Sequence, residues 1–215
     1  MRGPRRAPSV TVRPELGTRY GAAVGGGDAT EATAWAALLR AVNLGGRNRV
    51  PMADLRDALT GAGFEAVRTY IASGNVVFRH AEPDRATLAG AIEELVERSF
   101  GVTTTAILRT AGELRALVDA HPFGRDTSNS HVTFLAGEPD AVAVTQLEAL
   151  DIAPDAFHVV GGDVFLHYPN GVQGSRLTIA LLERRLGVPG TNRTWKSVER
   201  VAELAAKAED ESEAA

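Results

Sequence analysis

The chain of 215 residues is 44% hydrophobic and 23% charged with a formal net charge of −4, the composition of a globular protein with one good core or two small ones. It contains no cysteine, which excludes disulfides, thiolate nucleophiles, iron–sulfur clusters and every cysteine-containing zinc site. Residues 35–80 hold six arginines against three acids, so the charge distribution allows a local basic patch but excludes a basic protein.

The first 33 residues mix arginine, proline, glycine and small residues without helical or strand periodicity. Such a segment buries too little apolar surface to offset its chain entropy, so we predict a disordered extension over residues 1–33. Its arginines precede no apolar signal region, and no stretch of the chain reaches the roughly 18 apolar residues of a membrane span. The sequence therefore predicts a cytoplasmic protein without a membrane partner.

Residues 34–125 have the pattern of a ferredoxin-like subdomain. A continuous apolar run from Trp35 predicts a strand buried on both faces, and a helix follows from Pro51. After a hairpin come an amphipathic helix over residues 84–101 and a strand over 103–110. The order β-α-β-β-α-β matches the split βαβ unit of ferredoxin-like folds.

The hairpin of this subdomain covers residues 67–78. Its apolar faces match when the turn has two residues, either Ser73 and Gly74 or Gly74 and Asn75. Arg68, Tyr70, Val77 and Arg79 are then predicted on the face opposite the apolar one.

A helix over residues 111–120 and a loop rich in turn formers lead to a second α+β subdomain, residues 126–206. A strand, a helix, a hairpin on a Gly-Gly turn and another helix repeat the element order. A last helix over residues 191–206 and an acidic tail over 207–215 complete the chain. We predict an α+β fold of two ferredoxin-like (βαββα-type) halves with antiparallel sheets and a C-terminal helix. The likeness between the halves is one of element order, so no duplicated site is expected.

Three segments carry a resemblance to a known family: ALLRAVNLGGRNRVPMADLR, RTYIASGNVVF and the C-terminal TNRTWKSV. On these segments the chain resembles domain-of-unknown-function family 1697, bacterial proteins without an established activity. The resemblance implies an α+β fold with a ferredoxin-like N-terminal part. The family positions are matched by Arg40, Asn43, Gly45, Met52, Tyr70, Ser73, Gly74, Asn75, Ser175, Arg193 and Trp195. Thr194 stands where the family usually has asparagine, and Arg176 where it usually has lysine.

Residues 43–49, with the sequence NLGGRNR, are the strongest candidate for a ligand site. Gly45 and Gly46 let the backbone turn sharply, while Asn43, Arg47 and the other polar residues supply donors just before a helix N-terminus. The pattern favours a phosphate or carboxylate ligand, yet it is neither a P-loop nor a dinucleotide-binding fingerprint. A loop with turn glycines and exposed arginines explains the same residues.

Arg40 stands at the end of an apolar strand, where a guanidinium must be paired or reach the strand's exposed end. The hydroxyl of Ser73 and the amide of Asn75 reach the same ligand if the hairpin tip faces Asn43. Turn geometry alone also explains these residues. No G-x-S-x-G elbow or triad partner accompanies Ser73, so the sequence does not predict a serine hydrolase and leaves open whether any reaction is catalysed.

The predicted ligand-binding set is Arg40, Asn43, Gly45, Arg47, Tyr70, Ser73, Asn75 and Arg193. The favoured partner is a small anionic ligand or nucleotide. Two alternatives stay open: nucleic acid stacked on Tyr70 between Arg68 and Arg79, and a structural or regulatory domain acting through protein contacts. No cofactor or metal is predicted, because His158 and His167 share a hairpin face with Asp163 as the only local third ligand. The oligomeric state is left open.

Overall fold

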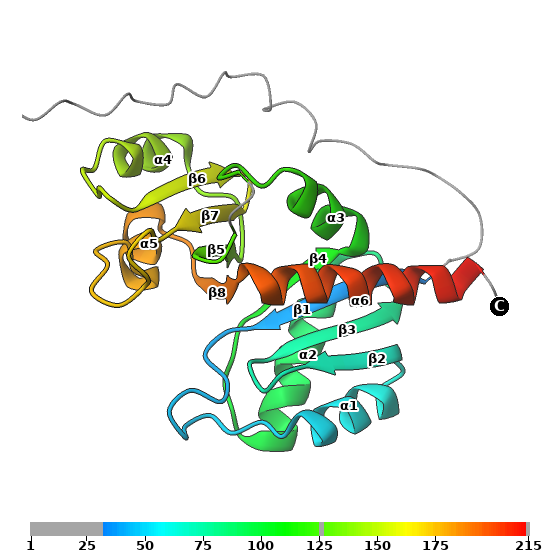
Figure 1. Ribbon diagram of the computed structural model, residues 1–215. Helices are drawn as coiled ribbons and strands as arrows, with labels where there is room; N and C mark the ends of the chain where they lie inside the picture. The colour runs from blue at the N-terminus through cyan, green and yellow to red at the C-terminus, as the bar shows by residue number, and fades with distance from the viewer. Residues whose placement is uncertain (1–31, 125–126, 214–215) are drawn as a thin grey trace, which may run out of the picture.

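The computed structural model of the protein describes residues 32–124 and 127–213 (Figure 1). Most of the segment predicted to be a disordered extension, residues 1–31, lies outside the described residues. The described part contains two four-stranded sheets in which every strand pair is antiparallel. The predicted fold class is confirmed: two ferredoxin-like halves are followed by a C-terminal helix.

The first sheet has the order β2-β3-β1-β4. Its strands are β1 (Thr33–Leu39), β2 (Glu65–Tyr70), β3 (Asn75–His80) and β4 (Ala106–Thr110). Both faces of β1 are covered, which explains its continuous apolar sequence. Trp35, Ala37 and Leu39 pack on the outer side against helices α1 (Met52–Gly61) and α2 (Arg85–Phe100).

The second sheet repeats the topology with the order β6-β7-β5-β8. Its strands are β5 (Ser130–Leu135), β6 (Ala156–Val160), β7 (Asp163–His167) and β8 (Gly190–Thr194). Helices α4 (Ala141–Glu148) and α5 (Ile179–Leu186) cover its outer face through a core that includes Leu147 and Leu182.

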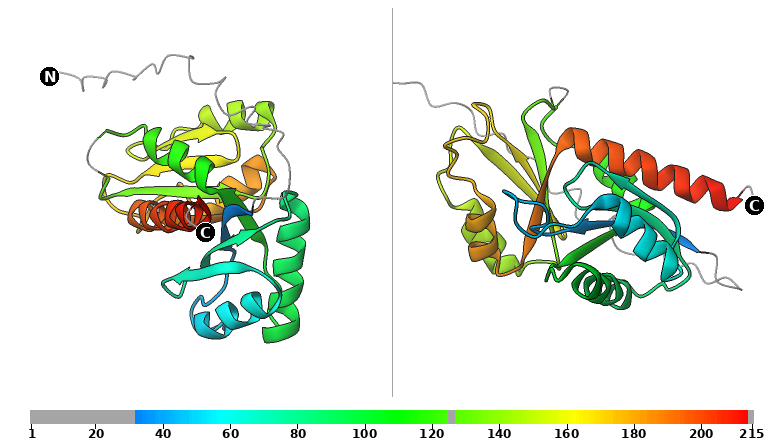
Figure 2. Two further views of the ribbon diagram at one scale, coloured as in Figure 1. Left: turned by 90° about the vertical axis from the view of Figure 1, so that its right-hand side faces the viewer. Right: turned by 90° about the horizontal axis from the view of Figure 1, so that it is seen from below.

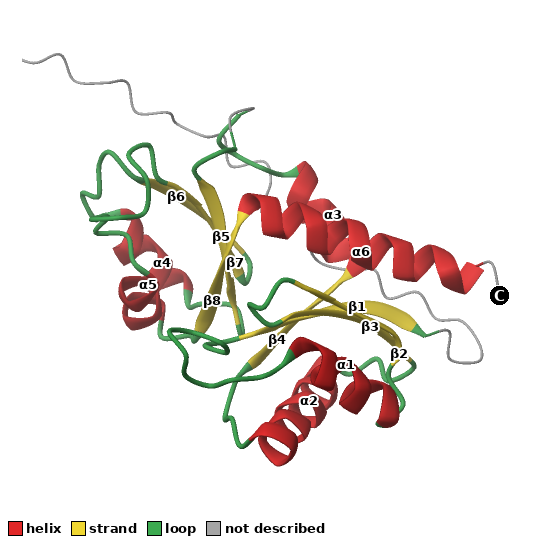
Figure 3. Ribbon diagram, turned by 60° about the horizontal axis from the view of Figure 1, so that its bottom comes forward, coloured by secondary structure: helices red, strands yellow, loops and turns green. Residues whose placement is uncertain are grey.

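The two remaining helices follow equivalent strands and pack side by side between the sheets (Figures 1 and 3). Helix α3 (Ala111–Asp119) follows β4, and α6 (Trp195–Glu213) follows β8. Their apolar faces share one core with the inner faces of both sheets, including Leu38, Phe134 and Trp195. This central core joins the halves, and Figure 2 shows α6 running along the sheet of the first half.

Three local expectations need correction. Strand β8 was not predicted, because its sequence GTNRT lacks apolar residues; it lies at a sheet edge and pairs only with β5. Helix α6 continues to Glu213 through most of the expected acidic tail, since Ala205 and Ala208 are fully buried against the body.

The third correction concerns the first hairpin, for which the predicted two-residue turn is wrong. Tyr70 pairs with Asn75, so the turn consists of residues 71–74. Both turn lengths are even, and an even turn keeps the same residues on the same sheet face. The predicted faces therefore hold, with Thr69 opposite Val76 and Arg68 opposite Val77, while Ile71 is displaced into the turn and is 53% exposed.

Candidate functional site

Arg40 is paired within the protein and crosses from one half to the other. Its Nε and Nη2 donate to the two carboxylate oxygens of Glu183 on α5, at 2.9 and 3.1 Å. Burial raises the pKa of the Glu183 carboxyl, but hydrogen bonds from Arg40 and from the backbone N–H of Gly190, with the charge of Arg40, hold that pKa below its usual value. Arg40 is therefore paired, as its place at the end of an apolar strand required, and its partner lies in the other subdomain.

The loop of residues 43–49 is held by the side chain of Asn43, which adopts a left-handed backbone conformation with φ of 55°. Its amide N–H groups donate to the carbonyls of Val50 and Ala72, both at 2.9 Å, and its amide oxygen accepts from the N–H of Val50 at 2.8 Å. The loop thus lies beside the hairpin turn, as the predicted convergence of Asn43 with residues 73–75 required.

A cavity of about 480 Å³ opens beside this loop, and we call it the loop cavity. Its lining includes Arg47, Arg49 and the start of α1. The side chains of Arg47 and Arg49 have no hydrogen-bond or ion-pair partner within residues 32–124 and 127–213. Gly45 lies in the exposed part of the loop and does not line the cavity.

Gly74 closes the hairpin at a position where a side chain is strained. Its φ is +75°, and a Cβ built on it would lie 2.5 Å from Val42 Cγ2 and 2.8 Å from Leu39 Cβ. The carbonyl of Gly74 also accepts the backbone N–H of Leu39 at 2.8 Å. The turn is consequently packed directly on the end of β1.

Ser73 and Asn75 are engaged by Arg193 of the other half, in what we call the Arg193 cluster. Arg193 is 8% exposed, and Asn75 is 1% exposed. Arg193 Nε donates to Asn75 Oδ1, and Nη2 donates to the carbonyls of Leu39 and Ser73 at 3.0 and 2.9 Å. Nη1 donates to Thr191 Oγ1 and the Asn192 carbonyl.

All five N–H groups of the Arg193 guanidinium are therefore used, and none of them meets a carboxylate. Burial without a counter-ion lowers the pKa of Arg193 to about 10, which leaves the side chain charged at neutral pH. The Asn75 amide completes the arrangement by donating to Ser73 Oγ and to the carbonyl of Tyr70. The structure brings Ser73, Asn75 and Arg193 of the predicted ligand-binding set together, and each satisfies the others.

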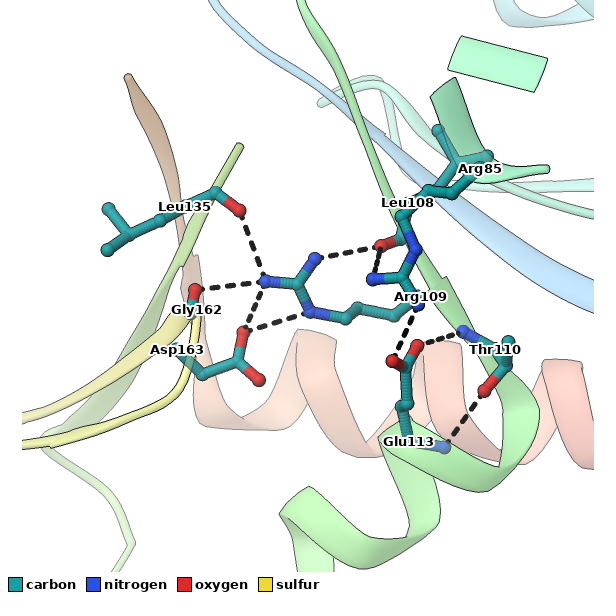
Figure 4. Close-up of polar contacts among 8 residues, drawn as sticks. All are labelled: Arg85, Leu108, Arg109, Thr110, Glu113, Leu135, Gly162 and Asp163. Atoms are coloured by element: carbon teal, nitrogen blue, oxygen red, sulfur yellow. Dashed lines mark hydrogen bonds and ion pairs between the residues drawn. The ribbon is translucent and has the colours of Figure 1, made fainter. Parts of the chain in front are cut away.

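The structure contains a second arrangement of this kind, centred on Arg109, that the sequence analysis missed (Figure 4). Arg109 is 7% exposed. Its Nη2 donates to the carbonyls of Leu135 and Gly162 at 3.1 and 2.9 Å, and Nε and Nη2 both reach Asp163 Oδ1, at 3.1 and 2.9 Å. We call these four residues the Arg109 cluster.

The two clusters are equivalent by topology. Arg109 pairs with Ala36 across β4 and β1, and Arg193 pairs with Val132 across β8 and β5. In each case the next residue is threonine, and the helix α3 or α6 follows directly. The expectation that the halves repeat only their element order is therefore wrong. The shared signal is the dipeptide Arg-Thr at the end of each fourth strand.

Beside the Arg109 cluster, Thr110 and Glu113 form a capping box at the start of α3. Glu113 also accepts from Arg85 at 2.6 Å. Burial raises the pKa of Glu113, but the hydrogen bonds from Arg85 and from the N–H of Thr110, with the charges of Arg85 and Arg109, bring it below its usual value. These contacts fix the side chains around the junction between the halves.

The sheet face proposed for base stacking is covered. Helix α6 packs on β1, β2 and β3, and Tyr70 lies partly buried against the central core. Arg68 Nη2 donates to both carboxylate oxygens of Glu211, at 2.6 and 2.7 Å. Among the other predicted site residues, Tyr70 contacts Asn75 through its backbone, while its ring lies against the central core.

Neither histidine of the second hairpin belongs to a metal-binding group. His158 and His167 share their sheet face with Phe165, which is buried in the central core. Within residues 32–124 and 127–213, no group of three histidine or acidic side chains is arranged to hold a metal ion. The helices in these ranges are each too short or too polar to cross a membrane.

The fold and its internal contacts define an α+β protein of two ferredoxin-like halves. Arginine side chains join the halves by donating hydrogen bonds to residues of the opposite half. A family model described as protein of unknown function, DUF1697, matches residues 32–165, and the chain belongs to this family. Conserved bacterial protein SP0830 from Streptococcus pneumoniae has a similar structure, with a TM-score of 0.68 and 22% sequence identity over 82% of this chain and 99% of that chain. A search of curated proteins gives no significant match. The structural likeness shows the shared fold.

Proposed function

We propose that the protein binds a small anionic ligand, one that carries a phosphate or carboxylate group, in the loop cavity. The observation that carries the proposal is that Arg47 and Arg49 both line this cavity of about 480 Å³ while neither has a partner within the described residues. Arginine matches the planar geometry of carboxylate and phosphate oxygens and favours them over other acceptors.

The start of α1 supports the same ligand chemistry. The first N–H groups of a helix have no partner within the helix, and together with the helix dipole they favour an anion. The N-cap of α1 is Pro51, which makes no side-chain hydrogen bond to these groups. Pro51 and Met52 both line the cavity, so a bound anion has access to donors of the first turn.

The loop supports the proposal because its backbone is already fixed. The side chain of Asn43 binds Val50, which follows the loop, and Ala72 of the hairpin turn. Asn48 Nδ2 donates to the carbonyl of Ala41, and the N–H of Arg47 donates to the carbonyl of Leu44, both at 2.9 Å. A preorganised loop loses less conformational entropy on binding than a mobile one. The hairpin contributes Ala72 to the cavity wall, whereas Ser73 and Asn75 are used by Arg193.

The proposal is tested by a thermal-shift panel of inorganic phosphate, pyrophosphate, nucleotides and di- and tricarboxylates, followed by calorimetric titration of the best ligand. A ligand at 100 times its dissociation constant stabilises the fold by about 2.7 kcal/mol. The double variant Arg47→Ala/Arg49→Ala should lose about tenfold in affinity or more, because charge-assisted hydrogen bonds are removed.

The matched control is Arg56→Ala/Arg185→Ala, which removes the same charge from exposed positions that do not line the cavity. Its affinity should stay within about twofold of the unaltered protein, since exposed charges that do not line the cavity make no contact with the ligand and are screened by salt. Equal losses in both double variants, or no shift across the panel, would contradict the proposal. If the protein bound single-stranded RNA with a steep salt dependence and bound no small anion, the nucleic-acid alternative would replace this proposal.

A further inference from the structure

The ends of β1 and β5 occupy equivalent places in the two halves. The N–H of Leu39 donates to the carbonyl of Gly74, and the N–H of Leu135 donates to the carbonyl of Gly162, both at 2.8 Å. The same agreement extends one residue further along each strand. Positions 40 and 136 can therefore be compared directly.

At these positions the backbone contacts are the same and the side chains differ. The N–H of Arg40 donates to the carbonyl of Thr105, and the N–H of Ala136 donates to the carbonyl of Pro189, both at 2.9 Å. In one half the side chain is a long cation, and in the other it is a single methyl group.

The carboxylates opposite these positions are equivalent as well. Glu183 Oε1 on α5 accepts the N–H of Gly190, the first residue of β8, at 2.8 Å. Glu93 Oε1 on α2 accepts the N–H of Ala106, the first residue of β4, also at 2.8 Å. Glu183 is paired with Arg40, whereas Glu93 forms no ion pair within residues 32–124 and 127–213.

Ala136 occupies the position in the second half that Arg40 occupies in the first. At this place the structure has a cavity of about 610 Å³ that is lined by both Ala136 and Glu93. We call it the Glu93 cavity. It lies between α2, β4 and the ends of β5 and β6, next to the Arg109 cluster of Figure 4. Gly90 and Gly137 also line it, so small side chains leave room beside the carboxylate.

The charges of the Glu93 cavity favour a cation. Its two guanidinium groups, those of Arg85 and Arg109, are already paired with Glu113 and Asp163. The lining includes three further carboxylates without an ion pair in the described part of the chain: Asp84, Glu93 and Glu138. An anion is disfavoured here, in contrast to the loop cavity.

We propose that the Glu93 cavity binds a small molecule that carries a guanidinium group, and that this group pairs with Glu93 as Arg40 pairs with Glu183. The protein itself supplies the template, because a guanidinium in the equivalent place reaches both oxygens of a carboxylate whose Oε1 also accepts a strand N–H. The planar fork of a guanidinium suits this bidentate geometry better than an ammonium point charge does. This site is separate from the loop cavity and takes the opposite charge, so neither proposal depends on the other.

The experiment is a calorimetric titration of the full-length protein with n-propylguanidinium, with n-butylammonium and the neutral isostere n-propylurea as comparison probes. The guanidinium probe should bind at one site, more tightly than the ammonium probe, and the urea should not bind. Glu93→Gln should weaken guanidinium binding by about tenfold or more, because the glutamine oxygen keeps the Ala106 contact but loses the charge.

Two further variants use the internal template. Ala136→Arg should abolish guanidinium binding, since its own side chain then occupies the place beside Glu93. Arg40→Ala should create a second binding site at Glu183 and raise the stoichiometry from one to two. This variant also shows that the probe is able to bind such a carboxylate.

Binding of the guanidinium probe that survives both Glu93→Gln and Ala136→Arg would overturn the proposal. So would a lack of binding to the unaltered protein at millimolar probe when Arg40→Ala does bind, and so would a preference for n-butylammonium. If Glu93→Gln proves unfolded by circular dichroism, the Ala136→Arg result decides, because that substitution fills an existing cavity.

Discussion

The Arg193 and Arg109 clusters place the same side chain at equivalent strand positions and surround it differently. Each guanidinium group donates to two backbone carbonyls of the opposite half. These are the carbonyls of Leu39 and Ser73 for Arg193 and those of Leu135 and Gly162 for Arg109. The side-chain partner from the opposite half is neutral Asn75 in one cluster and charged Asp163 in the other.

This difference shows that the carbonyls are the common element and that the counter-charge is not required. A cation buried without a carboxylate is kept charged by the five acceptors of the Arg193 cluster, although burial lowers the pKa of Arg193. Removing either arginine should therefore harm the junction between the halves, but to different degrees.

The largest expected effect is that of Arg109→Leu, which leaves Asp163 buried at 6% exposure without its partner. We expect a loss of about 3–5 kcal/mol in the free energy of unfolding, the usual cost of an uncompensated buried charge. Arg193→Leu should cost less, about 2–3 kcal/mol, because only neutral acceptors lose their donor. Urea denaturation followed by circular dichroism measures both.

The double variant Arg109→Leu/Asp163→Asn provides the control. It should recover part of the loss, since the asparagine removes the buried charge and reproduces the neutral partner of the other cluster. An Arg193→Leu protein less stable than Arg109→Leu would show that the counter-charge is not what separates the two clusters.

The second expected effect compares the glycines that precede Asn75 and Asp163. Gly74→Ala should destabilise by about 2–4 kcal/mol, because a left-handed backbone and an overlap with packed side chains both oppose the methyl group. A Cβ on Gly162 would meet Arg109 Nη2 at 3.0 Å, and no positive φ adds strain there. Gly162→Ala should cost about 1–2 kcal/mol, through the bonds of Arg109 alone.

Thermal unfolding of the two alanine variants separates these causes. Adding Val42→Ala to Gly74→Ala relieves the nearest overlap, 2.5 Å to Val42 Cγ2, and leaves the backbone strain and the 2.8 Å approach to Leu39 Cβ. Equal losses at Gly74 and Gly162 would mean that the packing of the hairpin turn on β1 contributes nothing specific.

The elements with apolar periodicity could be predicted from the sequence, and they determined the fold. The continuous apolar run of β1 correctly indicated burial on both faces, now seen as Trp35 and Leu39 on one side and Leu38 on the other. The pattern failed where pairing, not hydrophobicity, makes the strand. Strand β8 carries Asn192 and Arg193 and is held by the ladder with β5.

The candidate site was predicted as a set of residues but not as a set of contacts. Asn43, Ser73, Asn75 and Arg193 do converge, because the end of β1, the start of β3 and the end of β8 lie near one another. Their donors and acceptors satisfy one another, and no sequence pattern shows this. Arg109 was missed because a single arginine near the end of the strand AILRT has the pattern of a solvent-exposed residue. Its burial comes from the second half, whose Leu135 and Gly162 carbonyls accept its hydrogen bonds.

The smallest expected effect concerns the pair that distinguishes the two cavities, Arg40 and Glu183. Both side chains are partly exposed, at 39% and 22%, so Glu183→Gln should cost only about 1 kcal/mol or less at pH 7. Urea denaturation across a pH series measures how this loss depends on acidity.

The pKa of Glu183 is lower in the folded protein than its ordinary value of 4.5, so the folded state holds fewer protons than the unfolded state just below that pH. The contribution of the pair is therefore complete above pH 4.5 and disappears as the pH falls through the folded pKa. The unaltered protein and Glu183→Gln should converge in stability at low pH. Arg40→Ala should reduce the same pH dependence, because only the Gly190 N–H then lowers the pKa of Glu183. If Glu183→Gln keeps its full deficit in acid, the Glu183 carboxylate does not stabilise the fold through its charge, and the equivalence with Glu93 would then be one of shape alone.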